Sequence, residues 1–159
     1  MRGFGWNAAL AAAWVAVTGE IAAWNILLGV AFGLGVMVFA GGAVGAPGYV
    51  QLAWRTVKLG GFFIRELVLS NLRLALDVVV PKALMQPAIV AIPLDAETDA
   101  EITVLANLIT LTPGSTAIEI APDRKTLYVH VMYPEGGDLD ATRRAIKKGL
   151  ERRVLEVTR

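Results

Sequence analysis

Residues 21–40 read IAAWNILLGVAFGLGVMVFA, a stretch of twenty residues without a charged side chain. At about 1.5 Å per residue, a helix of this length extends about 30 Å, the thickness of the hydrocarbon core of a bilayer. The stretch therefore predicts a transmembrane helix and places the chain among membrane proteins.

A second apolar run, FGWNAALAAAWVAVT at residues 4–18, precedes this stretch and is separated from it by Gly19-Glu20. At roughly 23 Å it is a short span. A cleaved signal peptide is the alternative, because Arg2 stands before a short apolar stretch. The longer run that follows after two residues favours a membrane hairpin. We predict a transmembrane helical hairpin over residues 1–45, with Glu20 as a solvated turn carboxylate.

A pair of glycines, Gly29 and Gly33, lies on one face of the second helix. Residues four apart share a helix face, and two glycines there let another backbone approach closely. The alternative is the general tolerance of membrane helices for glycine. We include both glycines among the candidate residues for contact with another subunit.

The segment over residues 46–85 carries an amphipathic helix from Tyr49 to Val80, closed by Pro81. Its six charged side chains occupy about one third of a helical wheel drawn at about 100° per residue, and the remaining face is aliphatic and aromatic. These charged residues are Arg55, Lys58, Arg65, Glu66, Arg73 and Asp77.

Three placements of this helix remain open. It lies in the headgroup plane with its net positive charge toward anionic lipid, presents its charged stripe to a partner protein, or forms a third span. The number of charges favours the first two placements over a lone span. Arg73 and Asp77, four residues apart, are expected to pair on the same face.

The orientation follows from the basic residues. Arg2 precedes the first span, whereas Arg55, Lys58 and Arg65 closely follow the second. A hairpin puts both flanks on one side, and the positive-inside rule makes that side cytoplasmic. We therefore expect a cytoplasmic carboxyl-terminal half in a multi-pass protein of the cell membrane.

The tail over residues 86–159 has the composition of a small water-soluble domain, with twenty charged residues against two in residues 1–45. Alternation, helical spacing and turn residues predict a cytoplasmic α/β domain with the order β-α-β-β-α. The first strand reads as buried on both faces. The predicted elements are a strand at 88–94, a helix at 99–111, strands at 116–120 and 126–133, and a helix at 139–157.

Composition excludes most catalytic and cofactor chemistry. The chain has no cysteine, one histidine and a net charge of +1, which exclude thiolate and multi-histidine metal sites and give no global attraction to nucleic acid. His130 lies in LYVHV, where alternation puts it on the strand face opposite Val129 and Val131. We predict no catalytic residue, cofactor or metal, and no small-molecule substrate bound by this chain alone.

Two polar clusters in the tail have structural interpretations. Thr110, Thr112, Ser115 and Thr116 surround Pro113-Gly114 without a glycine-rich loop and lysine or a base, so they are predicted to cap and turn the chain. The basic doublets of the last helix are predicted to form a solvated face that reaches acidic headgroups. They are Arg143-Arg144, Lys147-Lys148 and Arg152-Arg153.

Four motifs in order carry a resemblance that covers nearly the whole chain: LALDVVVP (74–81), PAIVAIPL (87–94), NLITLTPGST (107–116) and LYVHVMY (127–133). With the hydrophobic hairpin before them, they resemble the E subunit of the Mrp-type (Mnh/Sha) multisubunit cation/proton antiporters. The family typically has Gly-Thr where this chain has Gly114-Ser115-Thr116, a conservative departure.

The resemblance implies an accessory subunit of a prokaryotic inner-membrane complex that exchanges cytoplasmic Na⁺ for external H⁺. It implies that the large subunits carry the proton path, and it brings no catalytic residue to this chain. The expected partners are the other antiporter subunits and the bilayer, with the charged stripe as the expected contact face. The alternative is a stand-alone membrane-tethered binding or regulatory module. The exchanged cation and the number of spans stay open.

Overall fold

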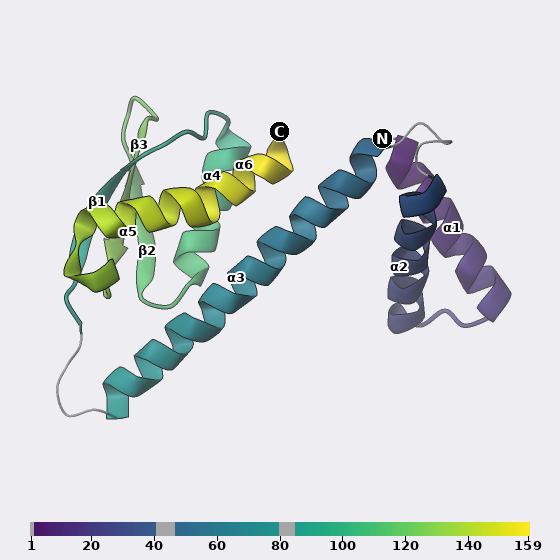
Figure 1. Ribbon diagram of the computed structural model, residues 1–159, viewed down its shortest axis with the longest axis horizontal. Helices are drawn as coiled ribbons and strands as arrows, with labels where there is room; N and C mark the ends of the chain where they lie inside the picture. The colour runs from purple at the N-terminus through teal and green to yellow at the C-terminus, as the bar shows by residue number, and fades with distance from the viewer. Residues whose placement is uncertain (1, 41–46, 80–84) are drawn as a thin grey trace. The chain divides into compact units, whose positions relative to one another are not determined.

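The computed structural model describes residues 2–40, 47–79 and 85–159 and divides into two compact units, Met1–Trp54 and Arg55–Arg159 (Figure 1). We describe each unit by itself. The first contains α1, α2 and the start of α3, and the second contains the rest of α3 and a small sheet with its covering helices.

Helices α1 (Arg2–Thr18) and α2 (Ala23–Ala40) pack against each other. Of the residues that the structure describes, α2 alone forms a helix long and apolar enough to cross a membrane, judged by length and composition. Helix α1 has 17 residues and extends about 26 Å. The predicted turn lies between the two helices, where Glu20 is exposed.

Polar side chains join the two helices near this turn. The indole Nε1 of Trp14 donates to Oδ1 of the buried Asn25 at 2.9 Å. The Nδ2 of Asn25 donates to Thr18 Oγ1 and to the carbonyl oxygen of Glu20, each at 2.7 Å. The side-chain amide of Asn25 is thus fully used, as a buried amide in an apolar setting must be.

Helix α3 (Pro47–Val79) begins two residues before the predicted start. Proline suits the first turn of a helix because its missing N–H has no partner there in any case. At 33 residues the helix extends about 50 Å, well beyond the thickness of a hydrocarbon core. Pro81, the predicted stop, lies outside the described residues.

The sheet has three antiparallel strands in the order β1-β3-β2. The strands are β1 (Ala88–Pro93), β2 (Ser115–Ile120) and β3 (Thr126–Val131). Strand β3 is central, with Val90 opposite Val129 on one side and Ala117 opposite Val129 on the other. Residues 121–125 form the hairpin loop between β2 and β3.

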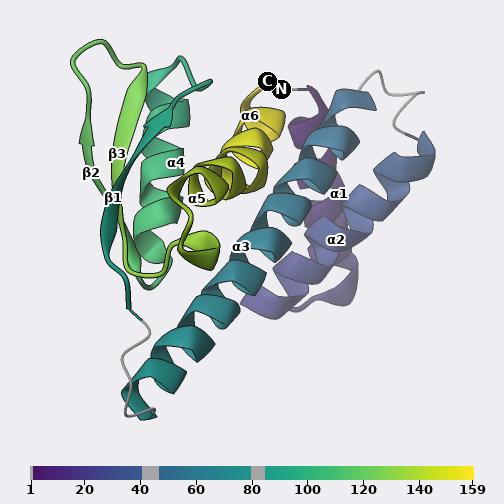
Figure 2. The same ribbon diagram turned by 60° about the vertical axis from the view of Figure 1, so that its left-hand side comes forward.

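Helices cover one face of this sheet. Figure 2 shows α4 (Asp99–Leu111) and α5 (Leu139–Ile146) beside the strands, with α3 on the far side of these helices. The core lies between the sheet and its helices. It consists of Val90, Ile92, Leu105, Ile109, Leu127, Val129, Val131 and Leu150.

The prediction that the first strand is buried on both faces is wrong. Val90 and Ile92 are buried, whereas Ile89 beside Val90 is 61% exposed. The helices cover only one face of the sheet, so alternate residues of β1 face away from the core. His130 follows the same rule, since it is half-buried between the buried Val129 and Val131, as predicted.

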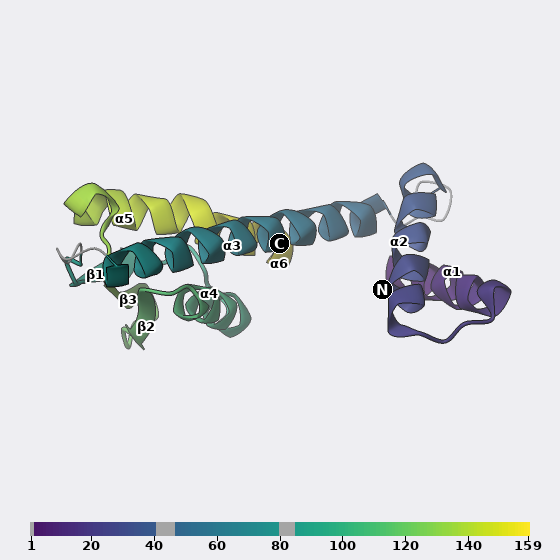
Figure 3. The same ribbon diagram turned by 90° about the horizontal axis from the view of Figure 1, so that it is seen from below.

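The carboxyl-terminal helix is interrupted by a π-helical turn, η2 (Lys147–Glu151), and continues as α6 (Arg152–Thr158), alongside α3 (Figure 3). The predicted solvated face is correct for Arg144, Lys148 and Arg152, which are exposed, but not for Arg143 and Lys147, which contact strand β1. Arg143 Nε donates to Ala91 O at 2.8 Å, and Lys147 Nζ donates to Pro93 O at 2.6 Å. Strand β1 is an edge strand, and these contacts satisfy carbonyl groups that no neighbouring strand reaches.

Candidate functional site

The charged stripe of α3 faces the chain's own α/β domain along most of its length. Near one end, Arg55 Nη1 donates to the carbonyl oxygen of Glu156 at 2.8 Å. Near the other, the hydroxyl of Tyr133 donates to Asp77 Oδ2 at 3.3 Å. These two contacts fix α3 against the domain over 22 residues of helix, about 33 Å.

An aromatic residue anchors the middle of this contact. Phe62 packs against the hydrophobic core, and the guanidinium carbon of Arg153 lies 3.9 Å from the centroid of its ring. Gly149 in the π-helical turn makes room for the ring, because a Cβ there would meet Phe62 Cζ at 3.1 Å. The sequence offered one signal of this contact, since Phe62 interrupts the charged face of the wheel.

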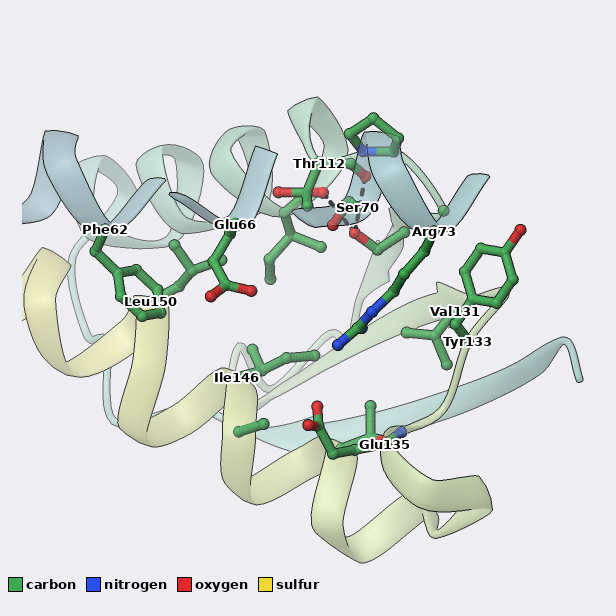
Figure 4. Close-up of a pocket in the computed structure, with 16 residues that line it drawn as sticks. Phe62, Glu66, Ser70, Arg73, Thr112, Val131, Tyr133, Glu135, Ile146 and Leu150 are labelled. Atoms are coloured by element: carbon green, nitrogen blue, oxygen red, sulfur yellow. Dashed lines mark hydrogen bonds between the residues drawn. The ribbon is translucent and has the colours of Figure 1, made fainter. Parts of the chain in front are cut away.

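A cavity of about 130 Å³ lies between α3 and the domain (Figure 4). Arg73 extends from α3 into this cavity, and Glu66 lies beside Ile146 and Leu150. The polar residues that line it are Glu66, Ser70, Arg73, Thr112, Ser115, Tyr133, Glu135 and Thr142. The sequence analysis did not predict that the residues outside α3 lie next to this helix, because only tertiary folding brings them together.

The predicted pair of Arg73 and Asp77 is not among the ion pairs of residues 2–40, 47–79 and 85–159. Asp77 accepts from Tyr133, and Arg73 turns into the cavity. Burial of the Tyr133 hydroxyl raises its pKa, and the negative charge and hydrogen bond of Asp77 raise it further.

One wall of the cavity is the turn around Pro113-Gly114, part of the motif that carried the resemblance. Gly114 has φ +86°, and a Cβ there would meet the Tyr133 ring at 3.1 Å. Ser115 Oγ donates to Ile109 O at 2.8 Å, and Thr112 Oγ1 donates to Leu108 O at 2.9 Å. The capping and turn roles predicted for Thr112 and Ser115 are confirmed. Thr110 Oγ1 accepts from Ala117 N at 3.2 Å, whereas Thr116 lies in strand β2.

The two remaining members of the stripe, Lys58 and Arg65, are exposed at the flank of the contact. Arg65 Nη1 pairs with Glu66 Oε1 at 2.7 Å. An exposed pair of neighbouring residues of this kind contributes little to stability. These two basic residues therefore remain at the surface of the α/β unit.

The predicted glycine pair lies in the other unit, against α1. A Cβ at Gly29 would meet Ala11 O and Trp14 Cδ1 at 3.1 Å, and one at Gly33 would overlap Asn7 Oδ1. Both glycines are buried and serve the packing of α1 against α2. Contact of these glycines with another subunit stays a prediction.

Two buried carboxylates that the sequence analysis did not single out hold the carboxyl-terminal helix to the loop before α4. Glu151 Oε1 accepts from Asp95 N at 2.6 Å and from Ala96 N at 3.1 Å. Glu101 forms a capping box with Thr98. The hydrogen bond from Arg159 holds the pKa of Glu101 well below its usual range, helped by the N–H groups of Glu97 and Thr98. The spacing Thr98-x-x-Glu101 is the sequence signal for this cap.

No group of three or more His, Cys, Asp or Glu residues that could hold a metal ion occurs in the described ranges. The cavity holds hydroxyl groups, two carboxylates and one guanidinium, and its hydroxyl groups at Thr112 and Ser115 donate to backbone carbonyl oxygens. This arrangement is suited to joining α3 to the domain.

The sequence profile of a family described as "Na+/H+ ion antiporter subunit" matches residues 7–157. The chain belongs to this Na+/H+ antiporter subunit family. It is 32% identical to the E subunit of the Na(+)/H(+) antiporter of Alkalihalophilus pseudofirmus over 153 residues, 96% of each chain. It is also 32% identical to the corresponding E subunit of Bacillus subtilis over the same length, again 96% of each chain.

A solved structure shares the fold of this antiporter subunit. A chain of an archaeal respiratory membrane complex, the membrane-bound sulfane sulfur reductase, aligns with a TM-score of 0.55 at 20% identity. The alignment covers 96% of both chains, so the similarity in fold extends over the hairpin, α3 and the α/β domain. The predicted family is confirmed, and with it the assignment to a transporter component of the membrane.

Proposed function

We propose that this chain is a non-catalytic accessory subunit of a multisubunit antiporter that exchanges Na⁺ or a similar cation for H⁺ across a prokaryotic cell membrane. The observation that carries the proposal is the extent of the family match, residues 7–157, which takes in both units. The exchange itself is assigned to other subunits, and this chain contributes to assembly and activity.

The arrangement in the membrane is part of the proposal. Helices α1 and α2 form a spanning hairpin, and the α/β domain, with its strand-helix-strand-strand-helix order, lies in the cytoplasm. Supporting this, α2 has a mean hydropathy of 2.0 over 18 residues. The basic residues Arg55, Lys58 and Arg65 follow α2 closely, and the positive-inside rule assigns that side to the cytoplasm.

The charged stripe is proposed to act on assembly through the position of the α/β domain. Arg55, Glu66, Arg73 and Asp77 face that domain, so changing them alters how the domain is held on α3. The domain then presents a different surface to neighbouring subunits. Contact of the hairpin with another subunit at Gly29 and Gly33 is also part of the proposal.

The function is tested by antiport in everted membrane vesicles from a host that lacks this chain but retains the other subunits. Restoring the wild-type chain should restore the collapse of a preformed pH gradient on addition of Na⁺. Antiport that is equally strong without the chain would contradict the proposal.

The role of the stripe is tested by charge reversal, Glu66→Arg and Arg73→Glu. Each should lower the yield of assembled complex, because the reversed charge faces the cavity against the domain. Glu119→Arg, at an exposed position of β2, is the matched control. Wild-type yield and antiport in both cavity variants would contradict this role.

A further inference from the structure

Helix α3 has an exposed apolar face between Arg55 and Val79. Its members recur at spacings of seven, four, four and seven residues and lie within about 80° of the helix circumference at about 100° per residue. They are 52 to 79% exposed. The face consists of Val57, Ile64, Val68, Leu72 and Val79.

The opposite side of the same helix is occupied by the chain's own α/β domain. Contacts run from Arg55, bonded to Glu156, through Phe62 to Asp77, bonded to Tyr133. A domain with twenty charged residues in its sequence does not enter a hydrocarbon core. The part of α3 that carries it therefore cannot cross the bilayer.

We infer that α3 from Arg55 to Val79 lies along the cytoplasmic surface of the bilayer, with its exposed apolar face in the acyl-chain boundary and the α/β domain on its water side. The inference rests on the proposed function only for the sidedness of the membrane. It decides among the three placements left open by the sequence in favour of the headgroup plane.

Lipid fits this face better than a partner helix does. Helices that associate in membranes use small residues four apart at the contact. Gly61 and Ala75 lie on this face and are exposed, but they are fourteen residues apart and form no such pair, and the rest of the face is valine, isoleucine and leucine. The short connection to α2 also keeps the start of α3 close to the membrane surface. Helix α3 begins at Pro47, seven positions after α2, the candidate span, ends at Ala40.

The charges of α3 favour an anionic lipid surface. The helix carries four basic and two acidic side chains. Lys58 and Arg65 lie at the flank next to Leu72 on the wheel, and both are exposed. Their aliphatic stems can follow the apolar surface while their charged ends reach phosphate groups in the headgroup layer.

The placement is tested with the full chain in bilayers that contain anionic lipid. Because the chain has no cysteine, single spin labels can be attached at Val57→Cys, Ile64→Cys, Val68→Cys and Leu72→Cys. Thr116→Cys, at an exposed position of β2, is the water-side control. The accessibility of each label to oxygen and to a water-soluble nickel chelate reports its depth.

All four labels on α3 should be accessible to oxygen and protected from nickel, at one shared shallow depth, while the control label is accessible to nickel. A depth that increases steadily from position 57 to position 72 would show a spanning helix and overturn the inference. Low accessibility to both reagents would show a protein partner, and full accessibility to nickel would show that no lipid covers the face. Either result also overturns it.

The contribution of charge is tested by the double variant Lys58→Glu/Arg65→Glu. It should make the four labels shallower, and replacing the anionic lipid by a zwitterionic one should have the same effect. Unchanged depth in both experiments would contradict the contribution of anionic lipid to the placement of α3. These readouts do not depend on other subunits, so failure of the proposed function in the antiport assay is a separate result.

Discussion

The guanidinium carbon of Arg153 lies 3.9 Å from the ring centroid of Phe62 and joins the last helix of the chain to α3. Arg153 is held in this position by a hydrogen bond from its Nη1 to Gly149 O at 2.8 Å. A cation above an aromatic ring is attracted by the negative face of the ring. This contact lies between the two polar contacts that join α3 to the domain.

Phe62→Ala should weaken the attachment of α3 to the α/β domain. The substitution removes a half-buried aromatic ring and the partner of Arg153, which we expect to lower the free energy of unfolding by about 1–2 kcal/mol. Hydrogen exchange of the full chain in detergent should show faster exchange in α3 and α6. Ile64→Ala, on the exposed face of the same helix, is the control and should leave both helices unchanged.

Gly114→Ala should destabilise the turn that forms one wall of the cavity. The φ of +86° is unfavourable for alanine, and the added Cβ would lie 3.1 Å from the Tyr133 ring. A residue held in such a conformation costs about 1–3 kcal/mol before the steric contact is added. Gly136→Ala separates the two effects, since Gly136 has φ +60° with open space around it. Equal melting temperatures for the two variants would contradict a destabilising contact between the new Cβ at position 114 and the Tyr133 ring.

The ion pair of Glu101 and Arg159 should make stability depend on acid pH. The pKa of Glu101 is lowered in the folded state from its ordinary value of 4.5, chiefly by Arg159. The folded state therefore gains stability above about pH 4.5, and that gain is lost as the pH falls toward the folded pKa. Glu101→Gln should lower stability at neutral pH and flatten its decline below about pH 5. Thermal unfolding from acid to neutral pH measures this, with Glu119→Gln as the control.

Gly33→Ala should disturb the packing of α1 against α2. The new Cβ would overlap Asn7 Oδ1, and Asn7 also donates from Nδ2 to the hydroxyl of Tyr49 at 2.9 Å. Overpacking of this kind costs about 1–3 kcal/mol. Limited proteolysis of the full chain in detergent should cut between the helices sooner. Gly35→Ala, with open space around it, should match the wild type.

The periodicity of the sequence was sufficient to locate most elements. Helix α4 was predicted with its bounds, 99–111, because its apolar spacing ends at the turn residues Pro113-Gly114. One local feature was missed. The π-helical turn at Lys147–Glu151 leaves the apolar spacing of the last helix nearly unchanged, so the sequence pattern does not indicate it.

The partners of the charged stripe were not predictable from the wheel. A wheel groups Arg55, Glu66, Arg73 and Asp77 on one face, but it carries no information about what covers that face. The structure places the chain's own domain there, a contact between residues as far apart in the sequence as Arg55 and Glu156. Phe62, an apolar residue within the charged face, was the local sign of such a contact.

The central claim, that this chain is a subunit of a cation/proton antiporter complex, is tested most directly by affinity purification of the tagged chain from its native membrane in mild detergent. Mass spectrometry should identify several large multi-span antiporter subunits that co-purify in a fixed ratio. Recovery of a folded, monodisperse chain alone, under conditions in which those subunits remain assembled with one another, would contradict the account.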